Sequence, residues 1–215
     1  MTHTLHREGK VESLEDDLLL LITPAIGRND AGAAEKLKRL IDIVFELGPV
    51  NYGCYEQGRN IFSGVTADEI KENTGDRSRI RCVFSDRRNF RDLMLRIVKE
   101  NTGLSVTVSG LMSTIGEIAA DLGLKPHSVN LSLGVHGNRS LLPHDDMRQI
   151  TTMCGHGMVA PSLVKNMIGK IKKGRLSPQE AAIELAKPCI CGVFNTERAS
   201  DLLQRMLPFW CLHHR

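Results

Sequence analysis

The sequence predicts an α/β fold with a small parallel sheet of three or four strands joined by crossover helices. Short β-rich runs alternate with helical patterns in the middle of the chain, in the order strand, helix, strand, helix, strand. This alternation is typical of parallel strands with right-handed crossovers. The 215 residues, 41% of them hydrophobic, are enough to bury a core. We expect one domain, with a helical N-terminal segment (10–75), the α/β core (79–150) and a helical C-terminal subdomain (151–208).

Two helices are predicted at the start of the chain, Glu12–Ile26 and Asn29–Leu47. The second has apolar residues at helical spacing and is followed by Gly48, which can end a helix. Asn51–Gly64 is rich in Gly and Asn and is expected to form an irregular loop. Thr66–Asn73 is predicted to be a short helix.

The core is predicted from three strands and two helices. The strands are Ile80–Phe84, Leu104–Val108 and Val129–Leu133. The helices are Arg88–Asn101 and Met112–Leu122, and a glycine follows each of them closely.

The C-terminal subdomain is predicted to be entirely helical. Its helices are a short one that ends at Ile150, then Pro161–Lys172, Pro178–Ala186 and Thr196–Leu207. His144 or Asp145 is expected to cap the short helix. Ser177 begins a capping box with proline at the first helical position, which defines the start of the third helix.

Charge and hydropathy exclude several classes of function. The net charge is only +3, and the densest basic stretch, 77–91, lacks the interleaved stacking aromatics typical of nucleic-acid binding. No apolar run is long enough to span a bilayer. Residues 1–10 lack the apolar core of a signal peptide, so we expect a cytoplasmic protein. The expected partner is a small-molecule substrate, with no nucleic acid or membrane, and the composition is compatible with a homodimer.

Six cysteines need a reason other than disulfides in a reducing cytosol. Cys154 lies in the turn Met153–Gly157, and Cys189 and Cys191 lie in the turn Pro188–Gly192. Thiolates are favoured near helix N-termini. The two predicted helices between these turns form a hairpin, which should bring the start of the first helix close to the end of the second. The sequence therefore predicts that the three sulfur atoms meet.

Three converging thiolates favour an iron–sulfur cluster or zinc over magnesium or calcium. The chain has a C-x-C spacing and lacks the paired C-x-x-C knuckles of many structural zinc sites. We therefore expect Cys154, Cys189 and Cys191 to hold a [4Fe-4S] cluster with one open iron, with zinc as the alternative. His156 or Cys54 would complete a zinc tetrahedron.

The resulting hypothesis is a cytoplasmic iron–sulfur enzyme, of lyase or desulfurase type, suited to an anaerobe. Its open iron would act as a Lewis acid in elimination, hydration or sulfur removal. His136, His144 and His156 are the expected catalytic residues, because loops at strand ends carry ligand sites and imidazoles transfer protons near neutral pH. The expected substrate-binding residues are Asn51, Ser85, Ser109 and Arg198. A non-catalytic binding module stabilised by zinc is the second hypothesis.

A third hypothesis comes from a local resemblance. Met153-Cys154-Gly155-His156-Gly157 resembles the cysteine motif of proline racemases, and Pro188-Cys189 is similar to their second cysteine turn. The resemblance implies a metal-free enzyme in which two cysteines act as acid and base across an amino-acid α-carbon. It covers about ten residues. The rest of the chain departs from that longer, strand-rich family, whose two cysteines lie far apart in sequence.

Overall fold

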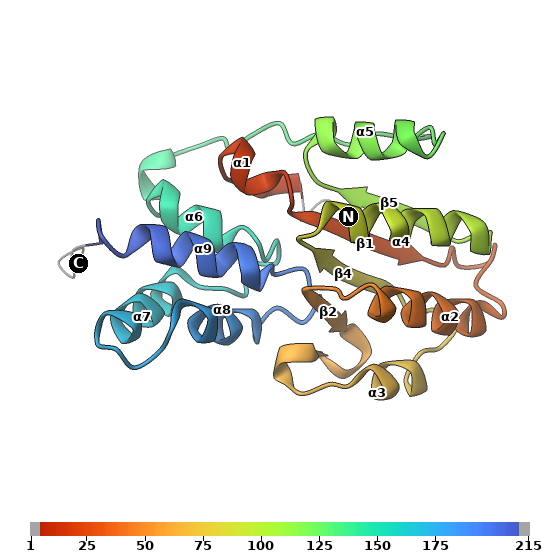
Figure 1. The fold of residues 1–215 in the computed structure, drawn as a ribbon, viewed down its shortest axis with the longest axis horizontal. Coiled ribbons are helices and arrows are strands. Elements are labelled where there is room, and N and C mark those ends of the chain that lie inside the picture. The colour runs from red at the N-terminus through yellow and green to blue at the C-terminus, as the bar shows by residue number, and fades with distance from the viewer. Residues whose placement is uncertain (1–4, 211–215) are drawn as a thin grey trace.

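The structure, a computed structural model, describes residues 5–210 and contains a five-stranded sheet with helices on both faces (Figure 1). The strands are β1 (Leu18–Thr23), β2 (Asn51–Cys54), β3 (Arg59–Asn60), β4 (Ile80–Phe84) and β5 (Ser105–Ser109). The α-helices are α1 (Val11–Leu14), α2 (Ala33–Glu46), α3 (Ala67–Glu72), α4 (Arg87–Glu100), α5 (Met112–Asp121), α6 (Asp145–Thr151), α7 (Pro161–Lys172), α8 (Pro178–Ala186) and α9 (Thr196–Met206). Short 3-10 helices are η2 (Tyr55–Gln57), η3 (Ile61–Ser63) and η4 (Arg139–Leu141).

The sheet is antiparallel, so the prediction of a small parallel sheet is wrong. Its strand order is β3-β2-β4-β1-β5, and every pair of neighbours within the described residues is antiparallel. β1 lies between β4 and β5, so that Leu20 pairs with Cys82 on one side and with Val108 on the other. β4 and β5 do run in the same direction, as expected for strands joined by one crossover helix, but β1 separates them. β1, α2, β2, β4, α4 and β5 together have the split β-α-β topology of ferredoxin-like folds.

The N-terminal segment was expected to be helical, yet it contributes three of the five strands. The predicted helix Glu12–Ile26 consists of the short helix α1 and the strand β1. The run of apolar residues in β1 is buried on both faces, with Leu18 and Leu20 in one core and Leu19 in the other. A short continuous apolar run has no period that separates a buried strand from a helix, which explains the error.

The predicted strand Val129–Leu133 does not form. The segment between α5 and η4 has no regular secondary structure, and its alternating apolar residues stay exposed, Leu133 by 86%. Its alternation satisfies the strand pattern. To join the sheet, this segment would have to pair with the edge strand β5. However, β5 has no fully buried residue, so a strand added beside it would have no buried face to extend.

Two hydrophobic cores lie on opposite faces of the sheet. One contains Leu20, Cys82 and Phe84 of the sheet together with apolar residues of α2, α4 and α5. The other contains Leu19 and Val83 together with the inward faces of α6 to α9. The second core is the one that contains the cysteine turns.

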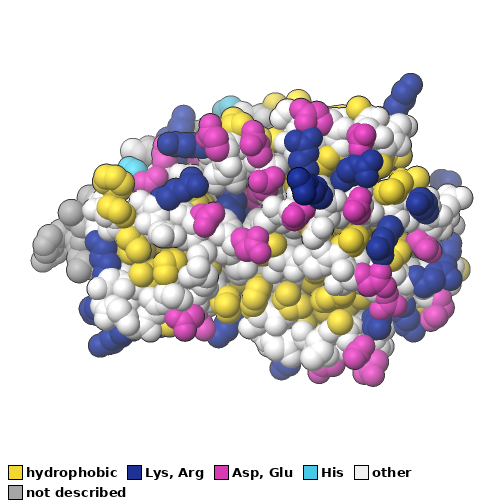
Figure 2. Space-filling model, in the orientation of Figure 1, with side chains coloured by type: hydrophobic (Ala, Val, Ile, Leu, Met, Phe, Trp, Pro, Cys, Tyr) yellow, Lys and Arg dark blue, Asp and Glu magenta, His cyan; other side chains and the backbone are white. Residues whose placement is uncertain are grey.

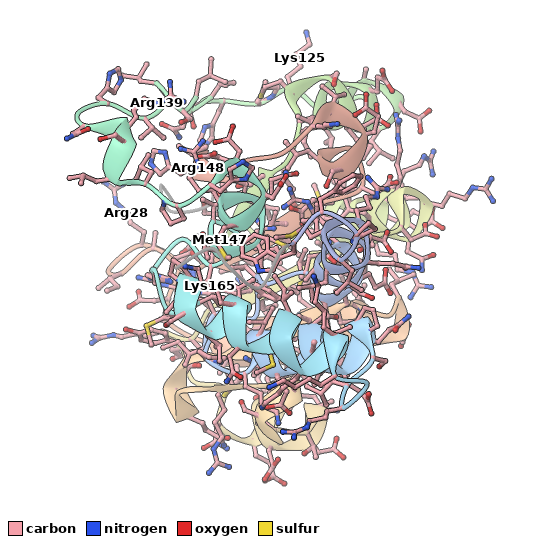
Figure 3. All side chains as sticks on the ribbon, turned by 90° about the vertical axis from the view of Figure 1, so that its left-hand side faces the viewer. Arg28, Lys125, Arg139, Met147, Arg148 and Lys165 are labelled. Carbon is pink, nitrogen blue, oxygen red and sulfur yellow. The ribbon has the colours of Figure 1, made fainter. Side chains whose placement is uncertain are left out.

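The C-terminal subdomain has the predicted helices. α7 and α8 have the predicted bounds, and the capping box of Ser177 and Glu180 is present. α6 begins after His144, whose ring accepts a hydrogen bond from the backbone N–H of Asp146. α7 lies in front in Figure 3, which also labels Met147 and Arg148 on α6. The side chains of Met147 and Arg148 are both buried, and Met147 belongs to the second core.

The arginine-rich surface carries acidic partners. Figure 2 shows Lys and Arg side chains mixed with Asp and Glu on one face of the molecule. Arg87 and Arg91 of α4 pair with Glu117 and Asp121 of α5. Across residues 5–210, no helix combines the length and the hydropathy needed to cross a membrane.

Candidate metal centre

The two cysteine turns meet in the second core. The first turn connects α6 to α7, the second connects α8 to α9, and α7 packs against α8. A hydrogen bond joins the side chains of Cys154 and Cys189, and Cys191 lies close enough to interact electrostatically with both. The three side chains are nearly inaccessible to solvent, at 2%, 0% and 2% exposure. The convergence predicted from the helical hairpin is therefore present.

The pKa values of the three cysteine thiols are shifted in different directions. The hydrogen bond from Cys189 lowers the pKa of Cys154 to about 6, and backbone N–H groups of His156 and Met158 act in the same direction. That hydrogen bond raises the pKa of Cys189 well above its ordinary value, with burial adding to the effect. Burial raises the pKa of Cys191. Sulfur atoms that accept backbone hydrogen bonds are typical of metal-bound cysteines.

His156 lies on the outer side of this cluster of thiols. Its Nδ1 is 3.5 Å from Sγ of Cys191. The residues Gly155–Met158 are exposed, whereas the remaining sides of the cluster are formed by the helices of the second core. His156 is therefore the member of the group that solvent and small molecules can reach.

Arg81 is a buried cation beside the thiols. Its position in β4, between two residues that face the first core, directs its side chain to the face that carries Cys191. Its positive charge opposes the effect of burial on the pKa of Cys191. The residue is 7% exposed, its guanidinium lies over the Tyr55 ring at 4.9 Å, and Nη1 has no hydrogen-bond partner among the described atoms. A buried cation of this kind is costly unless an anion balances it.

Two buried asparagines, Asn51 and Asn60, hold the second turn. Asn60 was not among the predicted site residues. Asn60 Nδ2 donates to the carbonyl oxygens of Ala186, Lys187 and Cys189. Asn51 Nδ2 donates to the carbonyl oxygen of Phe194. Asn51 was expected to bind substrate, whereas here it fixes the backbone that follows Cys191. Both residues belong to the segment predicted as an irregular loop, where a polar composition gave no indication of burial.

Arg7 joins the two turns directly, a role that no sequence motif marks. Its Nη2 donates to the carbonyl oxygen of Met153, which begins the first cysteine turn, and to that of Val193, which follows the second. Its Nη1 pairs with the buried carboxylate of Asp17, which also pairs with Arg198.

The other expected site residues lie in different surroundings. Arg198 is buried and bonds Asp17, Ser13 and the carbonyl oxygen of Glu8, so its guanidinium is engaged within the fold. Ser85 donates to Asn195. Ser109 lines a separate cavity of about 160 Å³ between β5 and the N-terminal segment.

The other two histidines that were expected to be catalytic, His136 and His144, bond within their own loops. His136 Nε2 bonds the carbonyl oxygen of Leu133, and His144 caps α6. Both are exposed, and no hydrogen bond found among residues 5–210 links either to a cysteine. Cys54, the other candidate for a fourth zinc ligand, belongs to the core on the opposite face of the sheet.

Within the described part of the chain, there is no group of three or more His, Cys, Asp or Glu side chains that could hold a metal ion. No protein family, curated protein or solved structure matches this chain.

Proposed function

We propose that this chain is an iron–sulfur enzyme whose cluster is held by Cys154, Cys189 and Cys191. One iron keeps a position that no cysteine fills, where it acts as a Lewis acid on a small substrate in elimination, hydration or sulfur removal. The observation that carries the proposal is the meeting of three buried thiols from two turns that are separated by a helical hairpin. Soft sulfur ligands in this number favour iron–sulfur centres or zinc.

The charge of the surroundings supports an anionic centre. Three thiolates bring negative charge into a buried site, and Arg81 supplies a positive charge there without a carboxylate partner among the described ion pairs. Arg7 and Asn60 fix both turns through backbone carbonyl oxygens, which leaves the sulfur atoms available to a metal. Such support by surrounding hydrogen bonds is typical of metal sites.

The exposed turn Gly155–Met158 is the side from which a substrate would reach the iron. His156 is the histidine positioned to move a proton there, because it touches the thiol cluster. This proposal retains His156 as a catalytic residue and gives no part to His136 or His144, whose hydrogen bonds stay within their loops.

The visible spectrum of protein purified without oxygen tests this proposal. We expect a brown protein with the broad absorption of an iron–sulfur cluster. Cys154→Ser, Cys189→Ser and Cys191→Ser should each lose most of that absorption. Cys82→Ala is the matched control, since Cys82 is equally buried but lies on the other face of the sheet. A colourless wild-type protein, or absorption that survives in all three site variants, contradicts the proposal.

A zinc-stabilised binding module is the second candidate, favoured by the contact between His156 and Cys191. A tetrahedral ion with bonds of about 2.3 Å to sulfur and about 2.1 Å to nitrogen places these two ligands about 3.6 Å apart. The observed separation is 3.5 Å. This candidate predicts a colourless protein that contains one zinc ion for each chain.

The metal-free racemase-like mechanism has less support. An acid and a base that act on opposite faces of one carbon atom must leave room for that atom between them. Cys154 and Cys189 instead share a hydrogen bond. This mechanism predicts a metal-free enzyme that iodoacetamide inactivates.

A further inference from the structure

We propose that the cavity beside β5 binds a small carboxylic acid with an apolar body, whose carboxylate group pairs with Arg7. The cavity has a volume of about 160 Å³ and is lined by β5, the start of α5, the N-terminal segment and residues 130–132. Ser109, which the sequence predicted to bind substrate, belongs to this lining, and none of the cysteines does. The inference therefore needs no metal ion and goes beyond the function proposed above.

Arg7 supplies this cavity with a buried hydrogen-bond donor. Its side chain is 6% exposed, and it lines the cavity together with Asp17. Nη1 of Arg7 pairs with Asp17, and Nη2 donates to two backbone carbonyl oxygens, whereas Nε has no acceptor among the described residues. A buried donor that lacks a partner lowers the stability of the fold. An oxygen atom of a bound ligand would satisfy this donor.

The charges around Arg7 indicate an anionic ligand. Oδ2 of Asp17 lies 2.5 Å from Arg7 and 3.1 Å from Arg198, so one buried carboxylate is shared by two buried guanidinium groups. Glu8 pairs with a third arginine, Arg148. Burial lowers the pKa of Arg198, Asp17 opposes this effect, and the positive charge of Arg7 adds to it. A ligand carboxylate would balance the second buried cation.

The rest of the lining defines the size and polarity of the ligand. Leu14, Leu19, Leu111 and Ile115 give the cavity a largely apolar wall. Leu111 is also the N-cap of α5 and offers the first N–H groups of that helix no side-chain acceptor, which favours an anion at this end. An apolar cavity of about 150 Å³ holds a molecule the size of benzene. The space therefore fits one carboxylate with a body of about five or six carbon atoms, and it is too small for a nucleotide.

Isothermal titration calorimetry of the full chain with 4-methylpentanoate tests the inference. We expect one molecule to bind per chain with a dissociation constant of about 1 mM or lower, which a ligand of this size can reach. The uncharged 4-methylpentanamide should bind at least about tenfold more weakly, because hydrogen bonds between charged partners are stronger. Acetate should also bind at least about tenfold more weakly, because it lacks the apolar body.

Two leucines of one irregular segment provide a matched pair of variants. Leu131 lines the cavity and Leu133 does not, and their exposure of 64% and 86% means that neither change should unfold the protein. Leu131→Glu adds a like charge at the cavity and should weaken the binding of 4-methylpentanoate at least about tenfold. Leu133→Glu should bind it as the wild type does.

Four results would overturn the inference. They are the absence of saturable binding at millimolar concentrations, equal affinity for the acid and its amide, equal affinity for acetate, and the same affinity in Leu131→Glu and Leu133→Glu. Each of them leaves the function proposed for the cysteine site standing, because none of these measurements involves a cysteine or a metal ion.

Discussion

Gly53 of β2 and Gly192 of the second cysteine turn cross at such close range that neither has room for a side chain. A Cβ on Gly53 would lie 2.1 Å from the carbonyl carbon of Cys191, and one on Gly192 would lie 2.0 Å from the nitrogen of Gly53. This crossing sets the position of Cys191 relative to the sheet, and therefore relative to Arg81 on the neighbouring strand β4.

Alanine at either glycine should displace the Cys191 turn. We expect Gly53→Ala and Gly192→Ala each to lower the free energy of unfolding by about 1–3 kcal/mol or more, as overpacking does, and to reduce the iron bound per chain. Gly116→Ala is the control, because a Cβ there meets no atom within 4 Å. It should stabilise α5 by about 0.5–1 kcal/mol. Urea unfolding and iron analysis measure both effects, and full iron binding by the Gly53 and Gly192 variants would show that the crossing does not position the site.

Asn60→Ala should loosen the second turn. The change removes the donor to three carbonyl oxygens and leaves those of Ala186 and Cys189 buried without it. We expect the free energy of unfolding, measured with urea, to fall by about 2–4 kcal/mol, because these buried hydrogen bonds are lost. Asn73→Ala removes one hydrogen bond to Glu69 on the surface and should change stability little. Equal losses of stability in Asn60→Ala and Asn73→Ala would contradict the role of Asn60 in holding the second turn.

Asp17→Asn should destabilise the link between the N-terminal segment and the cysteine turns. Asp17 is 2% exposed and balances both Arg7 and Arg198. Removing one partner of a buried charge group typically costs about 3–5 kcal/mol. Asp121→Asn, which breaks the exposed pair with Arg91, is the comparison and should have little effect. Thermal and urea unfolding measure the stability of both variants. A loss of stability in Asp17→Asn no larger than in Asp121→Asn would contradict a role of Asp17 in linking the N-terminal segment to the cysteine turns.

The metal-free protein should contain one thiolate at neutral pH. We expect the ultraviolet absorbance of the Cys154 thiolate to titrate with a midpoint near pH 6. This midpoint lies below the ordinary pKa of a cysteine thiol, 9.0. Because the folded-state pKa is the lower one, the stability contributed by this group is fully present above the ordinary pKa and is lost as the pH falls toward 6. Cys189→Ala removes the hydrogen-bond donor and should move the midpoint upward. A midpoint that does not change would show that Cys189 is not the cause.

The sequence was sufficient to predict the local parts of this fold. α7 and α8 follow their apolar period and the capping box at Ser177, and the hairpin they form brings Cys154 to Cys189. The sheet could not be predicted in the same way. β1 is a short apolar run without a period, and its position between β4 and β5 is decided by burial on both faces, a tertiary effect.

The supporting residues of the site were missed for a similar reason. Arg7 bonds Val193, Asn60 bonds Cys189, and Arg81 lies near Cys191, so each acts on a segment more than a hundred residues away in the chain. No local motif marks such a contact. An arginine within the short apolar, β-rich run Ile80–Phe84 is the sequence feature that could have drawn attention to Arg81.

The most direct measurement is the content of iron, acid-labile sulfide and zinc in the wild-type protein, isolated and kept without oxygen. We expect iron and sulfide in equal amounts, with little zinc, and the loss of both when Cys154 becomes serine. Wild-type protein that is folded, carries none of the three and takes up none when iron and sulfide are supplied would contradict a metal centre at these cysteines.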